Sequence, residues 1–121
     1  MWKYSCYGAA IILLYAGLVL LFSPSTQVVF VGAPLDAGAE VMGARSAPLF
    51  LAMALTFVLF SSLEASTLRR RFAAIAAFFW SLIAVLGTWH WMQDMVTASV
   101  FGAVVVEAVV AVTFIAQIRS R

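Results

Sequence analysis

The chain has 121 residues, of which 65% are hydrophobic and 10% are charged, and its formal net charge is +2. Soluble domains carry about 25% charged residues, and a domain this short buries only ~60–70% of its surface, so folding in water is excluded and lipid is the expected solvent. The single cysteine, Cys6, excludes an intramolecular disulfide, and one Cys with one distant His do not make a structural zinc site.

Four apolar segments dominate the chain, and each is close to the ~20 residues that cross a bilayer. They are continuously apolar rather than alternating, which favours helices over the strands of a barrel. No small-x-small cleavage site follows the first segment, so we keep it as a span rather than a signal peptide. The sequence predicts an all-α integral membrane protein, a single-domain four-helix transmembrane bundle with up-down-up-down order, whose spans cover about residues 5–23, 46–63, 72–91 and 97–117.

The connection between the first two segments, residues 24–45, is the longest loop. Pro24 and Pro34 bracket an apolar stretch that is too short to cross a membrane, so we expect it to lie at the interface or fold back onto the bundle. Residues 36–45 are predicted to form a short helix that leads into the second span, with Pro48 near its first turn or kinking it.

Basic residues predict the orientation. With the N-terminus in the cytoplasm, Arg45 is the only Lys or Arg expected on the outer side, and the others are expected on the cytoplasmic side. The reverse orientation would place most of the basic residues outside. We therefore expect both termini in the cytoplasm and the chain in a bacterial inner membrane. The arginines expected to contact anionic lipid headgroups are Arg69, Arg70, Arg71, Arg119 and Arg121, and Lys3 lies on the same side.

Aromatic side chains flank the spans on both sides. Trp2, Tyr4 and Tyr7 stand near the inner interface, and Trp89 and Trp91 stand near the outer one. Such rings prefer the headgroup level, so we expect all five to anchor the protein there.

Glu107 is the most informative residue of the fourth segment. It lies about ten residues from the external end, or ~15 Å deep, where an ionised carboxylate costs at least ~2.5–3.5 kcal/mol. It should therefore face the bundle interior, and Tyr15, Thr56 and Ser81 lie at a similar depth. We predict that these four form a midplane polar cluster. Glu107 is then a proton- or cation-coupling group, or hydrogen-bonding glue between helices, or, facing outward, a contact for a partner subunit or a pigment-like ligand.

The external end holds a second candidate group. His90 and Asp94 are four residues apart and would share a helix face if the third helix continues that far, which makes them a candidate pH-sensitive pair. The alternative is an interfacial His flanked by anchoring tryptophans. Arg45 on the same side is expected to pair with one of the external carboxylates.

The sequence contains no H-E-x-x-H, G-x-S-x-G or C-x-x-C motif and no Gly-rich phosphate loop, so no catalytic residue, metal or cofactor is predicted. We favour a non-catalytic accessory or assembly subunit of a larger membrane complex, with lipids and other membrane subunits or further copies of the chain as partners and no nucleic acid. The first alternative is a small homo-oligomeric proton-coupled transporter or channel that uses Glu107. The second is a small membrane enzyme acting on a lipid or quinone.

Overall fold

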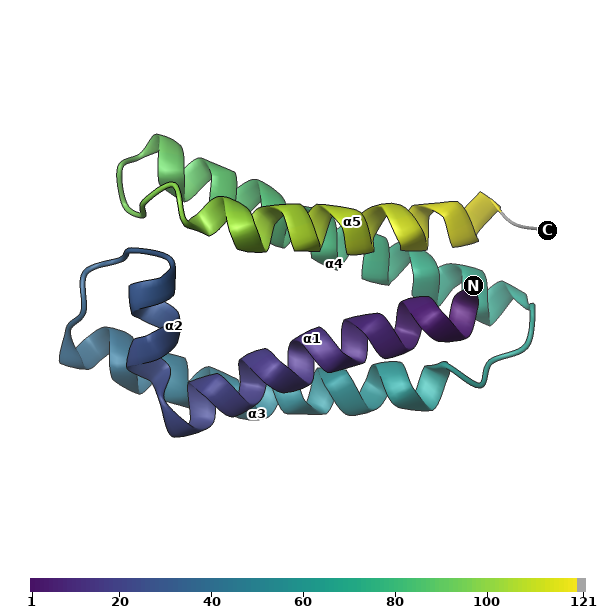
Figure 1. The fold of residues 1–121 in the computed structure, drawn as a ribbon. Coiled ribbons are helices and arrows are strands. Elements are labelled where there is room, and N and C mark those ends of the chain that lie inside the picture. Colours follow the sequence, from purple (N-terminus) through teal and green to yellow (C-terminus); the bar gives the residue numbers. More distant parts are fainter. Residues whose placement is uncertain (120–121) are drawn as a thin grey trace.

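A computed structural model describes residues 1–119. These residues form five helices and no strand: α1 (Trp2–Phe22), α2 (Pro24–Phe30), α3 (Ala37–Phe60), α4 (Thr67–Met92) and α5 (Val100–Arg119) (Figure 1). All but α2 are long and apolar enough to cross a membrane, which suggests a multi-pass membrane protein. The expected all-α class with four long apolar helices is confirmed.

The helix ends follow local chemistry. The α3 helix begins at Ala37, well before the apolar segment, because Asp36 caps it: the carboxylate Oδ1 accepts a hydrogen bond from the Ala39 N–H at 2.7 Å. The short helix expected over residues 36–45 is therefore the first part of α3, and Pro48 lies inside that helix. The α4 helix starts after Ser66, whose Oγ accepts from the Arg69 N–H at 3.2 Å.

The long helices form two pairs, with α1 packed along α3 and α4 packed along α5, while α1 touches α5 over a much shorter stretch. One glycine permits close approach in each pair. A Cβ on Gly17 would lie 2.8 Å from Leu51 Cδ2, and a Cβ on Gly87 would lie 2.8 Å from Val104 Cγ2. Small residues at such positions let helix backbones come together in a bilayer.

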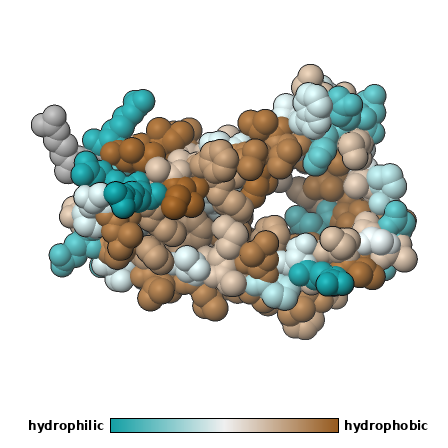
Figure 2. Space-filling view, turned by 180° about the vertical axis from the view of Figure 1, so that it is seen from behind, coloured by the Kyte–Doolittle hydropathy of each residue, from teal (hydrophilic) through white to brown (hydrophobic). Residues whose placement is uncertain are grey.

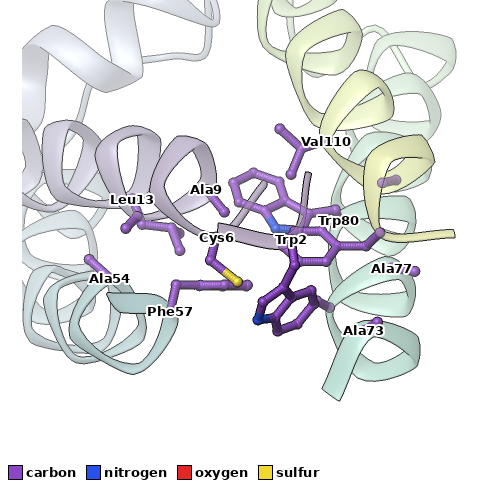
Figure 3. Packing of buried hydrophobic residues seen from close by; sticks show 14 residues of the cluster. Trp2, Cys6, Ala9, Leu13, Ala54, Phe57, Ala73, Ala77, Trp80 and Val110 are labelled. Atoms are coloured by element: carbon purple, nitrogen blue, oxygen red, sulfur yellow. The ribbon is translucent and has the colours of Figure 1, made fainter. Parts of the chain in front are cut away.

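The N-terminus and the last turn of α5 lie at one end of the molecule, which we call the terminal end, and α2 lies at the other, which we call the α2 end (Figure 1). The two pairs are joined at the terminal end by a core of aromatic and small side chains (Figure 3). Phe114 at its centre is 0% exposed, and its ring centroid lies 5.5 Å from that of Phe57 and 5.9 Å from that of Trp2.

Trp2 corrects one expectation, because it is 5% exposed and belongs to this core rather than to the membrane interface. Its indole Nε1 donates to the Phe60 carbonyl at 3.0 Å, and its ring meets Phe72 edge-on. The Arg69 guanidinium lies 5.1 Å from the ring centroid and donates to Gln117 Oε1 at 3.4 Å. The side chain points between the helix pairs, and its polar N–H finds a carbonyl there.

At the α2 end, the pairs meet through a small contact that we call the latch, formed by residues 30–32 and 97–99. The Ser99 hydroxyl donates to the Phe30 carbonyl at 2.6 Å, and the Thr97 N–H donates to the Val31 carbonyl at 3.1 Å. Gly32 has φ +70°, and the Thr97 side chain fills the space where its Cβ would be. The apolar stretch after Pro24 therefore folds back onto the bundle.

Candidate functional site: a central cavity between the helix pairs

A cavity of about 400 Å³ lies between the two helix pairs, toward the α2 end. Figure 2 shows the hollow between the pairs on the face opposite to that of Figure 1. Every helix contributes to its wall: Tyr15 from α1, Gln27 from α2, Phe50 from α3, Trp80 from α4 and Glu107 from α5. We refer to it as the central cavity.

The size of the side chains explains why the space is there. The α1 and α5 walls contain Ala16, Gly102 and Ala103, which project little or nothing toward the opposite wall. Bulky rings hold the pairs together at the terminal end, and the latch holds them at the α2 end, where Phe30 approaches Gly102. Small residues between two bridged ends leave a space that the chain itself does not fill.

Among residues 1–119, Glu107 is the only acidic residue that lines the cavity. It is half-buried, and within residues 1–119 its carboxyl makes no hydrogen bond and no ion pair. No Lys, Arg or His is among the residues that line the cavity in the described chain. A half-buried carboxyl without a partner in a largely apolar wall is costly unless it is neutral or finds a countercharge.

Trp80 separates the cavity from the core, since it belongs to both. The side chain is 2% exposed, and its indole Nε1 is the one buried side-chain N or O atom without a hydrogen-bond partner among residues 1–119. Such orphan donors are rare in folded proteins. Tyr15, Phe30 and Phe50 are the other aromatic residues that line the cavity.

The structure brings together two members of the midplane cluster expected from the sequence. Tyr15 and Glu107 both line the central cavity, and Tyr15 is 68% exposed at its edge. Thr56 is exposed on α3, where its hydroxyl donates to the Ala52 carbonyl at 2.9 Å, and it lines a separate apolar hollow between α3 and α4. Ser81 is half-buried next to Trp80 and lies outside the cavity lining in the described chain.

The residues expected at the external mouth lie apart from the cavity. His90 is exposed in the last turn of α4, and that helix ends at Met92, so Asp94 lies beyond it with φ 56°. The condition for a shared helix face is therefore not met. Arg45 is exposed on α3. Across residues 1–119, none of these groups forms an ion pair, and no three His, Cys, Asp or Glu gather as a metal site.

The arginines expected to meet lipid headgroups lie at the ends of two helices. Arg70 and Arg71 are exposed in the first turns of α4, and Arg119 is exposed at the end of α5. Arg69 is half-buried against Trp2, as described above, and Arg121 lies outside the described residues.

The contribution of α2 was missed from the sequence. The cavity wall includes Thr26, Gln27 and Phe30 from this helix. The available signal was Pro24, which occupies the first turn of α2, a position where proline is favoured. Trp80 was also missed, since a ring in the middle of an apolar span carries no sign of which way it points.

Comparison with protein-family models, with curated proteins and with solved structures finds no match to this chain.

Proposed function

We propose that this chain is a four-span membrane protein that binds a small amphipathic molecule in the central cavity and carries it as a transporter. The observation that carries the proposal is the cavity of about 400 Å³ with one unpartnered carboxyl, Glu107, in an otherwise largely apolar wall. Small-molecule sites have this character: they measure about 300–1,000 Å³, are mostly apolar and hold a few placed polar groups.

The bilayer is the source of the ligand. The cavity lies between helices that are apolar along their length, so molecules dissolved in the membrane reach it from the side. Tyr15 at the cavity edge offers a hydroxyl where such a molecule enters. A molecule with an apolar body and a polar head matches both the wall and the carboxyl.

A transporter fits this arrangement better than an enzyme. The enzyme considered from the sequence pairs Glu107 with His90 as acid and base, and His90 is exposed in the last turn of α4 rather than on the cavity wall. Binding and release of a ligand need only the cavity and a way for the helix pairs to part. The latch offers that way because few contacts hold it.

The proposed orientation is up-down-up-down with both termini in the cytoplasm of a bacterial cell. It is supported by the excess of basic residues on the side of the termini. Cysteines introduced at Ala65 and at Leu35, after Cys6 is replaced by serine, test it. A membrane-impermeant maleimide applied to intact cells should label the Leu35 site and spare the Ala65 site, and the opposite pattern would overturn the orientation.

Occupation of the cavity is tested with a matched pair of substitutions on α5. Ala103→Trp places a ring in the cavity, while Ala108→Trp places the same ring on the exposed side of the same helix. Native mass spectrometry after gentle extraction should find a small-molecule adduct on the wild type and on Ala108→Trp, but not on Ala103→Trp. Equal adducts on all three chains would mean that the molecule lies elsewhere, and no adduct on any would count against the proposal.

The accessory-subunit function remains a second candidate, and a stripe on α5 favours it. Val105, Val109 and Val112 are exposed and lie on one side of the helix at four- and three-residue spacing. Such a stripe suits another membrane subunit or a second copy of this chain. Val109→Trp should then remove a co-purifying chain, with Val85→Trp on α4 as the control. Unchanged co-purification would rule out this surface.

A further inference from the structure

The central cavity has a defined charge character. Its wall holds one acidic group, Glu107, and one phenol, Tyr15, while in the described chain no cationic side chain reaches it. The basic residues are elsewhere: Lys3 and the arginines of α4 and α5 lie at the terminal end, and Arg45 is exposed on α3. An anionic head placed in this cavity would meet a carboxyl with no cation to offset it.

The aromatic residues of the cavity wall also favour a cationic ligand. Tyr15, Phe30, Phe50 and Trp80 line the cavity together with Glu107. The face of an aromatic ring carries negative potential, and an ammonium group within about 6 Å of a ring is attracted to it, most strongly where water is excluded. A carboxyl combined with several rings is a suitable setting for an organic cation.

A neutral head fits less well. A quinone carbonyl or an isoprenoid hydroxyl leaves an ionised Glu107 without a countercharge in an apolar wall, or requires that the carboxyl stays protonated. A protonated amine supplies the countercharge and a charge-assisted hydrogen bond at once. The volume of about 400 Å³ lies at the small end of the range for ligand sites, which suits a compact apolar body.

We infer that the ligand of the central cavity is an amphipathic amine, held with its ammonium group on the Glu107 carboxylate and its apolar body against the aromatic wall. This inference rests on the proposed binding function and adds the chemical class of the ligand. The pairing requires the carboxylate form, so a protonated amine and a proton compete for Glu107: when the cation binds to the protonated site, one proton leaves. Tyr15 is the other titratable group on the wall.

The test uses two probes with one body, 4-phenylbutylamine and 4-phenylbutanol, titrated calorimetrically into the purified full-length chain in detergent. The amine should bind the wild type about tenfold or more tightly than the alcohol, since hydrogen bonds to charged groups commonly have effects of this size. Glu107→Gln should weaken amine binding to the level of the alcohol and leave alcohol binding within about twofold.

Two further substitutions distinguish the loss of the negative charge from a general effect on folding. Glu107→Asp keeps the carboxylate and should keep the preference for the amine, while Glu40→Gln removes an exposed acidic residue in the first turn of α3 and should change nothing. Equal affinity for amine and alcohol, or an amine preference that survives Glu107→Gln, would overturn the amine assignment.

The outcomes also distinguish this inference from the function on which it rests. If both probes bind equally and Ala103→Trp abolishes both, the cavity binds amphipathic molecules and only the amine class fails. If neither probe binds, the amine class also fails, and the adduct experiment on Ala103→Trp and Ala108→Trp decides whether the cavity is occupied at all.

Discussion

The two ends of the molecule are built differently. At the terminal end, large rings and small side chains interlock across the helix pairs, and Phe114 contacts rings from two other helices. At the α2 end, the pairs are bridged by the latch, and the central cavity lies between the latch and the core. The same four long helices therefore form a packed joint at one end and an open site at the other.

The difference shows how so small a chain can combine a packed core with a cavity. In lipid, helices associate through packing and hydrogen bonds, because lipid tails are as apolar as the side chains they replace. Close packing at the terminal end supplies that association. The helices toward the α2 end can therefore carry small residues and a carboxyl on the cavity wall, which makes this part of the molecule less stable than the core.

Removing one side chain from the core and one from the cavity wall should destabilise the protein to different extents. Phe114→Ala leaves a void in the packed core and should lower the free energy of unfolding by about 2–4 kcal/mol, from lost packing rather than from transfer to water. Ile83→Ala on the cavity wall removes a side chain that already borders a void, and should cost less than about 1 kcal/mol. Unfolding in mixed micelles measures both, and equal costs would contradict the distinction.

Two glycines of α1 test the close approach within a pair. Gly17→Ala places a Cβ 2.8 Å from Leu51 Cδ2 and 3.2 Å from Phe50 Cβ, so overpacking should cost about 1–2 kcal/mol. Gly8→Ala has nothing within 4 Å and should stabilise the helix by up to about 1 kcal/mol. If both substitutions change the free energy of unfolding in the same direction, α1 and α3 are not as close as described.

Acidification should weaken amine binding in the central cavity and leave the packed core unaffected. If the amine pairs with the carboxylate form of Glu107, as we propose, lowering the pH will protonate the carboxyl, remove the ion pair and weaken amine binding by about tenfold, whereas alcohol binding will stay constant. Calorimetric titrations across a pH series measure the effect. An amine affinity that rises on acidification, or that falls equally in Glu107→Gln, would contradict the competition between proton and amine.

The smallest expected effect concerns the latch. Ser99→Ala removes the 2.6 Å hydrogen bond to the Phe30 carbonyl and should cost about 1 kcal/mol, with faster amide exchange in residues 30–32 and 97–99. The control is Ser62→Ala, whose hydroxyl donates to the Leu59 carbonyl within one turn and should leave the latch amides unchanged. Unchanged exchange in Ser99→Ala would show that the latch does not depend on this bond.

Hydropathy was sufficient to find the four long helices, because length and continuous apolarity follow directly from the sequence. It could not show that α1 pairs with α3 and α4 with α5, or that a cavity lies between the core and the latch, since those features depend on where Gly17, Gly87 and the core rings face. Trp2 shows the same limit. Its position at the end of a span suggested the interface, whereas its side chain turns inward to the Phe60 carbonyl.

The candidate site was only partly foreseeable for a related reason. Counting residues from the end of a span gives the depth of a side chain but not its direction around the helix axis. Glu107 and Tyr15 line the same cavity, whereas Thr56 lines a separate hollow and its hydroxyl donates to the Ala52 carbonyl of its own helix. The cavity itself arises from missing side-chain volume at Ala16, Gly102 and Ala103, for which a single sequence offers no marker.

Distances between spin labels test the contrast between the packed core at the terminal end and the central cavity, which lies between that core and the latch. With Cys6 replaced by alanine, labels at Leu59 and Ile75 report on the terminal end, and labels at Leu49 and Val85 report on the open part of the same two helices; all four sites are exposed. We expect a narrow distance distribution for the first pair, and a broader one for the second that narrows when 4-phenylbutylamine is added. Equally narrow distributions that the amine leaves unchanged would contradict the account.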